Sequence, residues 1–358
     1  MLSNELTKLL KIDYPIIQAP MAGGVTSAEL VAAVSNAGGL GMIGAGYLSP
    51  EQLRAEIHHV RGLTKRKFGV NLFVPSEYSV DEQKINQSKA YLRPMEQELG
   101  IEDHAPDLSN YLQDVETFQE MVEIMLEEHI PVCSFTFGIP SKKIRTKLKE
   151  NASIIMGTAT TVQEAILNQE AGMDAVVVQG SEAGGHRGTF AGDARHSLIG
   201  LMSLIPQTAD QISIPIIAAG GIMDARGLLA AQCLGAQGVQ MGTAFLVCKE
   251  SGANPLHKNA ILEAAEDQVV LTKAFSGKMA QGINNRFIEK LQHVEAELPD
   301  YPLQNDLTKA IRKAAAASEN REYISLWSGQ SPRLAKGQTV NELIRNIISE
   351  IEKAKIGI

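Results

Sequence analysis

Hydrophobic residues in the first two-thirds of the chain form short runs that alternate with longer stretches of helical periodicity. The runs are rich in Val, Ile and Leu and lack a polar residue at every second position, which is typical of strands buried on both faces of a parallel sheet. We expect eight strands, at residues 14–20, 40–44, 68–74, 131–137, 153–158, 174–179, 214–219 and 238–245. The pattern therefore predicts an α/β protein.

The stretches between these runs predict helices at residues 27–37, 50–61, 115–129, 141–150, 161–171, 196–211 and 224–234. Several begin with a side chain that accepts hydrogen bonds from first-turn amides, namely Ser27, Ser141, Thr161 and Asp224. Eight strand–helix units over about 250 residues predict a closed (β/α)8 TIM barrel. An open, doubly wound sheet is the alternative, but it does not need eight units at this even spacing.

Two segments fall outside the alternation. Residues 75–114 are polar, charged and longer than a strand-to-helix connection requires. From Glu250 onward the periodicity predicts helices only, at residues 257–266, 285–297, 307–318 and 340–355. We therefore expect a barrel over residues 1–250, with 75–114 as a long loop over its active face. Residues 251–358 are expected to form a smaller, mainly helical cap domain plus the helix that closes the barrel.

Composition narrows the range of partners and compartments. The formal net charge of −8 disfavours nucleic acid, whose phosphates require a basic surface. The chain shows neither a signal-peptide pattern nor an apolar run of membrane-spanning length, so we expect no membrane contact and a cytoplasmic protein. Cys133, Cys233 and Cys248 lack metal-ligand spacing and are expected to be buried thiols in a reducing compartment. We predict no metal site.

Glycine-rich segments follow several of the predicted strands, at the end of a barrel where ligands bind. The pair Gly220 and Gly221 stands directly before the helix that Asp224 is expected to cap. Glycine has no Cβ to block a ligand, and free amides at such a turn donate charge-assisted hydrogen bonds of roughly 1.5–3 kcal/mol each. Loops after the seventh and eighth strands are the usual phosphate site of this fold. The sequence therefore favours a phosphate-bearing cofactor, with a ligand-free tight turn as the alternative.

Residues 39–44 match the dinucleotide pattern G-x-G-x-x-G but lack its structural context. That pattern requires a strand before it and a helix that opens from it. Here a predicted helix precedes the match, and the match itself lies in the second predicted strand. Small residues that pack within the barrel explain these glycines better than a nucleotide site does.

One histidine lies in a glycine-rich loop, residues 179–190, at the end of the sixth predicted strand. His186 is a candidate catalytic group because imidazole titrates near neutral pH. The alternative is a histidine that only holds the loop in place. Arg187 either attracts an anionic substrate or forms a surface ion pair, and the surface role is favoured. Glu182 is expected to be a solvated loop carboxylate.

At this point five motifs, in order along the chain, resemble those of nitronate monooxygenases, formerly called 2-nitropropane dioxygenases. They are Gln18-Ala-Pro-Met21, Gly69-Val-Asn-Leu-Phe73, Glu182-Ala-Gly-Gly-His-Arg-Gly-Thr-Phe190, Ala218-Ala-Gly-Gly-Ile222 and Gln240-Met-Gly-Thr243. The resemblance covers nearly the whole chain, including residues 282–287 and 326–330. It implies an FMN-dependent barrel with a smaller second domain. It also implies oxidation of alkyl nitronates, such as propionate-3-nitronate, by O2 to a carbonyl compound and nitrite, with a detoxifying role.

The resemblance also implies site residues. His186 matches the histidine that faces the flavin, either as a hydrogen-bond donor to the nitro oxygens or as the base that removes the α-proton of a neutral nitroalkane. The implied cofactor contacts are Ala19, Pro20, Met21, Asn71, Gln179, Gly184, Gly185, Gly220, Gly221, Gln240, Met241, Gly242 and Thr243. The expected partners are a small-molecule nitronate and O2, and the expected assembly is a monomer or a homodimer.

Three rival functions share this pattern. FMN-dependent enoyl-ACP reductases also have an Ala-Gly-Gly-His loop. They typically carry Gln-Gly-Gly-Met at the position of residues 18–21, follow the histidine with an apolar residue instead of Arg187, and are shorter. These differences favour the monooxygenase. An NAD(P)H:quinone reductase on the same scaffold is the second rival, and a non-enzymatic flavin-binding module is the third.

Overall fold

Parallel strands form the centre of the protein and close on one another as an eight-stranded barrel. The computed structural model describes residues 2–102 and 106–356; residues 1, 103–105 and 357–358, which belong to the predicted ranges 1–250, 75–114 and 251–358, lie outside the described part. The barrel strands are β1 (Ile16–Gln18), β2 (Gly41–Gly44), β3 (Phe68–Phe73), β4 (Val132–Thr136), β5 (Ile154–Ala159), β6 (Ala175–Gln179), β8 (Ile216–Ala219) and β9 (Gly238–Met241).

The order of the barrel strands is β1-β9-β8-β6-β5-β4-β3-β2, with every adjacent pair parallel. Strands β1 and β2, the first and last of this order, meet through Leu40, which directly precedes β2. The amide of Leu40 donates to the carbonyl of Ile16 at 3.0 Å, and the amide of Gln18 donates to the carbonyl of Leu40 at 2.9 Å. The sheet is therefore closed, and both the (β/α)8 fold and the eight predicted strands are confirmed.

The last predicted strand, residues 238–245, is too long. It ends at Met241, and the short helix α10 (Thr243–Leu246) follows. Gly242 has φ −102° and ψ −75°, which takes the backbone out of the extended region. Thr243 consequently lies at the start of a helix and not on a strand.

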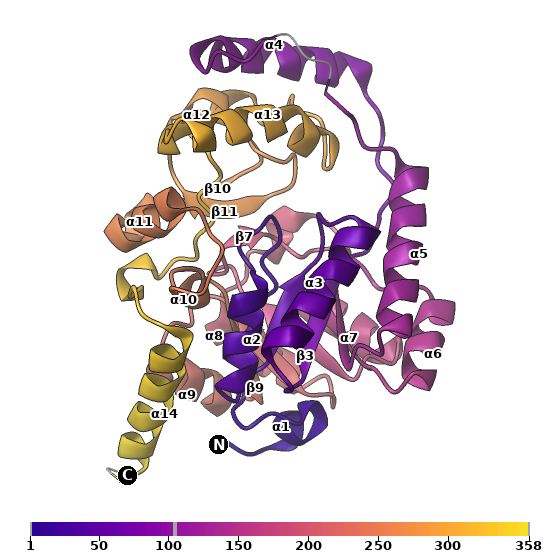
Figure 1. Ribbon diagram of the computed structural model, residues 1–358, viewed down its shortest axis with the longest axis vertical. Coiled ribbons are helices and arrows are strands. Elements are labelled where there is room, and N and C mark those ends of the chain that lie inside the picture. Colours follow the sequence, from indigo (N-terminus) through magenta and orange to yellow (C-terminus); the bar gives the residue numbers. More distant parts are fainter. Residues whose placement is uncertain (1, 103–105, 357–358) are drawn as a thin grey trace.

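Helices cover the outside of the barrel (Figure 1). They are α2 (Ala28–Asn36), α3 (Pro50–Leu63), α5 (Tyr111–Glu127), α6 (Lys142–Glu150), α7 (Val162–Glu170), α8 (Leu201–Ala209), α9 (Ala225–Cys233) and α14 (Val340–Ile356). The helix α1 (Glu5–Leu10) lies instead across the end of the barrel away from the cap (Figure 1), where Leu6 and Leu10 pack with residues of the strands. The predicted capping side chains of Ser27, Ser141, Thr161 and Asp224 all accept first-turn amides. Helix α14 packs against α9 and α2, where it completes the ring of helices.

The glycines of residues 39–44 serve packing inside this fold. A Cβ on Gly41 would lie 2.1 Å from the carbonyl oxygen of Val31, so only glycine allows β2 to approach α2 this closely. The structure thus agrees with the rejection of a nucleotide site at this segment.

The remaining elements stand over one end of the barrel. They are the helices α4 (Glu82–Glu98), α11 (Pro255–Glu263), α12 (Arg286–Leu291) and α13 (Leu303–Ala317) and the antiparallel strands β10 (Val269–Thr272) and β11 (Ala280–Ile283). Strand β11 also pairs with β7 (Gly185–His186), which belongs to the predicted histidine loop. The expectation of helices only after Glu250 is therefore wrong. The division of the chain at residue 250 stays a prediction.

Residues 75–114 do not form a simple loop over the active face. Their centre is the 17-residue helix α4, which lies across α12 and α13 at the far end of the molecule (Figure 1). Ile85, Leu92 and Met95 of α4 pack into the apolar cluster of the cap, and the hydroxyl of Ser88 donates to Gln304 Oε1 at 2.6 Å. Of the flanking residues, Pro75, Ser76, Tyr78 and Ser109 line a cavity on the barrel side of the cap.

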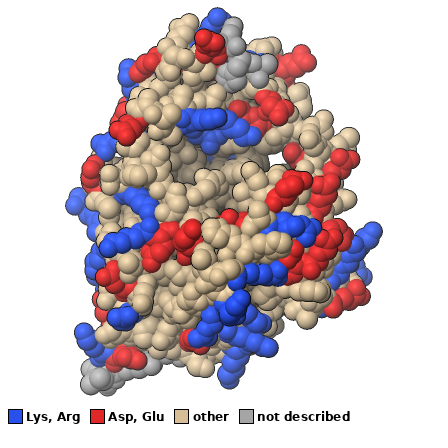
Figure 2. Space-filling model, viewed as in Figure 1, with Lys and Arg blue, Asp and Glu red and all other residues tan. Residues whose placement is uncertain are grey.

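The surface shows mixed charge. Figure 2 shows Lys and Arg side chains gathered at the upper edge of a hollow between the cap and the barrel. Among the described residues, no helix is both long enough and apolar enough to cross a bilayer. Cys133 and Cys248 are buried as expected, but Cys233 is exposed, because it closes α9 on the side that faces solvent.

Candidate functional site

A cavity lies where the carboxyl ends of the barrel strands meet the cap. Twelve of the predicted site residues line it, and they come from the ends of β1, β6, β8 and β9 and from strand β7. They are Ala19, Pro20, Met21, Gln179, Gly184, Gly185, His186, Gly220, Gly221, Gln240, Gly242 and Thr243. Segments that are distant in sequence therefore meet at one site, as the barrel prediction requires.

Two predicted cofactor contacts lie outside this lining. Asn71 is 2% exposed, and its amide donates to Ser134 Oγ at 2.9 Å and to Thr136 Oγ1 at 3.1 Å. Thr136 itself lines the cavity, so Asn71 reaches the site through a hydroxyl neighbour. Met241 is 1% exposed and packs in the barrel core. The side chain of Met241 thus belongs to the core and not to the cavity.

Three glycines of the cavity have backbone conformations that suit glycine alone. Gly185, Gly220 and Gly221 have φ values of +72°, +141° and +61°. Open space lies where Gly185 would carry a Cβ, and a Cβ on Gly221 would lie 3.1 Å from the Cβ of Glu182. These turns bring bare backbone to the cavity surface, which is the arrangement that a phosphate or a ring edge requires.

Gln179 fixes the loop that carries His186. Its side-chain amide donates to the carbonyl of His186 at 3.0 Å, and its Oε1 accepts the amide of Gly188 at 2.8 Å. On the other side, His186 pairs with Ala280 of β11. The histidine is thus held between the end of β6 and the cap hairpin, so both parts of the fold determine its position.

The imidazole of His186 lies in an aromatic and cationic environment. Its ring centroid lies 5.4 Å from Trp327, 6.1 Å from Phe137 and 6.1 Å from Tyr301. Burial, together with the positive charges of Lys278 and Arg312, lowers the pKa of His186 to about 3. The ring is therefore neutral at neutral pH.

Ser276 controls which ring nitrogen of His186 carries the proton. Its Oγ lies 2.8 Å from His186 Nε2 and 3.1 Å from the carbonyl oxygen of Lys278. The hydroxyl has one proton to donate. When it donates to the carbonyl, Nε2 is protonated and Nδ1 is an acceptor. When it donates to Nε2, Nδ1 carries the proton and is a donor.

Lys278 and the tyrosine pair Tyr47 and Tyr301 were not predicted from the sequence. Lys278 Nζ lies 4.5 Å over the ring of Phe137, and burial lowers the pKa of this lysine. The two tyrosine hydroxyls bond each other, and burial raises the pKa of Tyr301. No local pattern marked these residues. Lys278 lies next to a hairpin where helices were expected, and Tyr301 lies in a segment treated only as a break.

Arg187 and Glu182 differ from their predicted surface roles. Arg187 is fully buried, and its guanidinium donates to the carbonyls of Gly180 at 2.5 Å, Gln179 at 3.0 Å and Ser197 at 2.8 Å. Burial lowers the pKa of Arg187 to about 10. Glu182 Oε1 accepts the amide of Leu201 at 2.8 Å, at the start of α8. Both side chains turn inward because they bond backbone groups that lack a partner within the strand or helix. Arg187 bonds carbonyls at and after the end of β6, and Glu182 bonds an amide at the start of α8.

His257 of α11 is a second buried histidine of the cavity lining. It is 5% exposed, and its Nε2 lies 2.8 Å from the carbonyl oxygen of Trp327. Because a carbonyl only accepts, Nε2 carries the proton. Burial lowers the pKa of His257 to about 4, against the opposing effect of this hydrogen bond. The described part of the chain contains no cluster of three or more His, Cys, Asp or Glu side chains that would suit a metal ion.

Comparison with known sequences identifies a family. The family model described as nitronate monooxygenase matches residues 3–350. A protein named probable nitronate monooxygenase from Staphylococcus haemolyticus is 53% identical over 352 residues, which cover 98% of this chain and 97% of the relative. One of the same name from Staphylococcus aureus strain Newman is 52% identical over 351 residues, with 98% of each chain covered.

Comparison with solved structures agrees. The nitroalkane oxidase from Streptomyces ansochromogenes is 36% identical, with a TM-score of 0.91 over 98% of this chain and 99% of that chain. FabK from Thermotoga maritima is 30% identical, with a TM-score of 0.78 over 100% of this chain and 98% of that chain. The match over nearly all residues, on the fold and loops described above, shows that the chain belongs to the nitronate monooxygenase family of oxidoreductases, enzymes that oxidise nitronates.

Proposed function

We propose that this protein uses FMN and O2 to oxidise alkyl nitronates, such as propionate-3-nitronate, to a carbonyl compound and nitrite. The observation that carries the proposal is the neutral imidazole of His186 in a cavity bounded by glycine turns, with the charges of Lys278 and Arg312 near enough to lower its pKa. A nitronate is an anion with its charge spread over carbon and two oxygens. A cavity with positive potential and a neutral hydrogen-bonding ring suits that charge distribution.

The residues present fit FMN. The turns at Gly220 and Gly221 present bare backbone to a phosphate, and the amide side chains of Gln179 and Gln240 can bond the polar edge of a flavin ring. Gly185 leaves open space where any other residue would place a Cβ. When bound, FMN supplies the electron-accepting chemistry and passes electrons on to O2.

The protein's own residues position the anion and exclude water. Lys278, whose Nζ lies over the ring of Phe137 at the edge of the cavity, attracts the nitronate, and the rings of Phe137 and Trp327 cover the imidazole. With Ser276 donating to Nε2 of His186, Nδ1–H is free to donate to a nitro oxygen. A preorganised donor of this kind needs no rearrangement when charge shifts during the reaction.

The same geometry makes His186 a weak base. A general base works best when its pKa lies near the working pH, and the pKa of this imidazole is about 3. Removal of the α-proton from a neutral nitroalkane is therefore inefficient at this residue. We accordingly propose that His186 acts as a hydrogen-bond donor and that the preformed nitronate is the substrate.

Replacement of His186 tests this role. His186→Asn keeps a hydrogen-bonding side chain but removes the imidazole, and we expect a loss of roughly 10²-fold in kcat/KM for propionate-3-nitronate. Turnover on the nitronate and on its parent nitroalkane, together with FMN content, is the measurement. Unchanged turnover on both substrates would contradict the catalytic role. Anaerobic mixing of the unaltered protein with the nitronate should bleach the flavin, whereas a binding module should leave its spectrum unchanged.

A second candidate is enoyl-ACP reduction with NAD(P)H, favoured by the similarity to FabK from Thermotoga maritima. Two assays separate this reaction from quinone reduction. In one, NADH is oxidised in the presence of an enoyl thioester, and in the other it is oxidised in the presence of a quinone. The proposed nitronate oxidation predicts slow turnover in both assays. Detoxification of nitronates in the cytoplasm, by a monomer or a homodimer, is part of our proposal. The buried thiols of Cys133 and Cys248 are compatible with a reducing compartment.

A further inference from the structure

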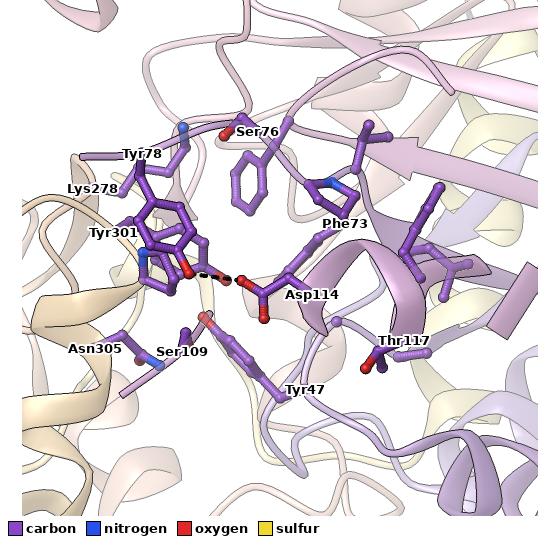
Figure 3. A pocket seen from close by; sticks show the side chains of 18 of the residues that line it. Tyr47, Phe73, Ser76, Tyr78, Ser109, Asp114, Thr117, Lys278, Tyr301 and Asn305 are labelled. Atoms are coloured by element: carbon purple, nitrogen blue, oxygen red, sulfur yellow. Dashed lines mark hydrogen bonds between the residues drawn. The ribbon is translucent and has the colours of Figure 1, made fainter. Parts of the chain in front are cut away.

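A second cavity adjoins the proposed flavin site on the cap side. We name it the outer chamber, and its walls come from the segment after β3, from α5 and from the start of α13. Tyr47, Phe73 and Phe137 line both cavities and form a divider between them. Figure 3 shows the chamber with Tyr47, Phe73 and Tyr301 around it. The divider places the two cavities within reach of one bound molecule.

One wall of the outer chamber is apolar. Leu72, Phe118 and Met121 line it and are 1%, 8% and 5% exposed. Leu72 belongs to barrel strand β3, whereas Phe118 and Met121 belong to α5. This wall is rigid on both sides, because the same three residues also pack in the core between the barrel and its helices. It suits an apolar group of fixed width.

Several polar side chains of the opposite wall are already bonded to protein groups, whereas the charged Lys278 lies at the divider, with its Nζ 4.5 Å over the ring of Phe137. Tyr78 donates its hydroxyl proton to Asp114 Oδ2 at 3.1 Å, a contact that Figure 3 marks. Asp306 accepts the amide of Ser109 at 2.8 Å and pairs with Lys309 Nζ at 2.7 Å. Groups satisfied in this way do not require a charged ligand. The apolar wall therefore favours a carbon chain, and Lys278 stays on the side where the anionic end of the substrate would lie.

The distance from His186 sets the length of that carbon chain. The ring of Phe137 in the divider lies 6.1 Å from the imidazole. An extended chain advances only ~1.25 Å per bond of ~1.5 Å, so about five bonds, counting the one from the nitro nitrogen to the first carbon, span this distance. The chamber has a volume of about 180 Å³, enough for about six groups of the size of a water molecule at ~30 Å³ each. A nitronate held at His186 would thus reach the chamber with an unbranched chain of five or more carbons.

We infer that the outer chamber binds the carbon chain of the substrate, so that the enzyme prefers nitronates with an unbranched apolar chain of five or more carbons. This inference rests on the proposed nitronate oxidation. It assigns the choice of substrate length to the cap and α5, whereas the reacting group is held by the barrel and β7.

The test is a series of nitronates from nitroethane to 1-nitrooctane with the FMN-loaded enzyme. We expect kcat/KM to rise with each added methylene once the chain passes the divider, by up to roughly fourfold, the factor for moving one CH2 out of water. Turnover of short nitronates with no rise for longer chains would overturn the inference and leave the proposed function standing. No turnover at any length would instead contradict the proposed function.

Variants on α5 locate the effect. Thr117 lines the chamber, and Thr117→Phe should flatten the rise with chain length. Leu112→Phe adds the same ring on the same helix, but Leu112 is 71% exposed, so the rise should persist. Met121→Ala enlarges the chamber and should shift the optimum to a longer chain. An unaltered dependence on chain length in both Thr117→Phe and Met121→Ala would overturn the inference.

Discussion

At the scale of single residues, the site depends on a histidine whose neighbours prevent its protonation. His186 combines burial with two cationic neighbours, and all three effects lower its pKa in the same direction. The same cations attract an anionic substrate, so one arrangement provides both the neutral ring and the positive potential. Ser276 then decides which nitrogen of the neutral ring is a donor.

Removal of the Ser276 hydroxyl should therefore lower activity without loss of cofactor. Ser276→Ala leaves Nε2 of His186 without its partner, which costs about 1–3 kcal/mol for a buried polar group. We expect kcat/KM for a nitronate to fall roughly 5- to 150-fold with unchanged FMN content. Ser153→Ala, which removes a buried hydroxyl at the opposite end of the barrel, is the matched control. Equal kinetics in the two variants would contradict the role of Ser276.

At the scale of elements, the histidine loop is held in place by the strand end behind it and the hairpin in front. Gln179 and Arg187 bond the carbonyls and amides where β6 ends, and β11 pairs with β7 from the cap. A charged guanidinium inside the protein is costly unless every donor finds an acceptor, and here three backbone carbonyls supply most of them. The loop is thus a rigid part of the fold.

The local pattern of hydrophobic residues was sufficient to predict those strands and helices that bury an apolar face of their own. The barrel strands are continuous apolar runs, and the outer helices carry capping residues such as Thr161 and Asp224, so both were predicted from the sequence. Strand β10 is different, because its four residues become a strand only through pairing with β11. Ser276, Lys278 and Tyr301 reach the site through this cap. Their contacts are long-range and leave no periodic signal in the chain.

The glycine turn after β8 offers a test of the cofactor site at this scale. Gly221→Val forces a β-branched residue into the left-handed region at φ +61° and places its Cβ 3.1 Å from that of Glu182. We expect FMN affinity to fall at least tenfold, measured as flavin retained after gel filtration. Gly192→Val imposes the same strain at φ +90° in open space and is the control. Full FMN stoichiometry in Gly221→Val would show that the turn does not hold the cofactor.

At the scale of the whole molecule, barrel and cap meet around the cavity, and a buried histidine lies at this junction. His257 of the cap is neutral when folded because burial lowers its pKa to about 4, against ~6.5 in an unfolded chain. Between pH 6.5 and 4 the unfolded chain therefore binds a proton that the folded protein does not. The stability that His257 contributes is fully present above pH 6.5 and is lost as the pH falls toward 4.

The size of this effect follows from the difference in pKa. About 2.5 pKa units at 1.36 kcal/mol each give about 3 kcal/mol. In urea unfolding with excess FMN, the advantage of the unaltered protein over His257→Gln should be about 3 kcal/mol larger at pH 7 than at pH 4. His293→Gln, at an exposed position of the cap, should instead follow the unaltered protein at both pH values. A constant difference between the unaltered protein and His257→Gln would mean that His257 accepts a proton without unfolding. In that case the junction of cap and barrel would open to water at acidic pH, and release of FMN in the same pH range would reveal it.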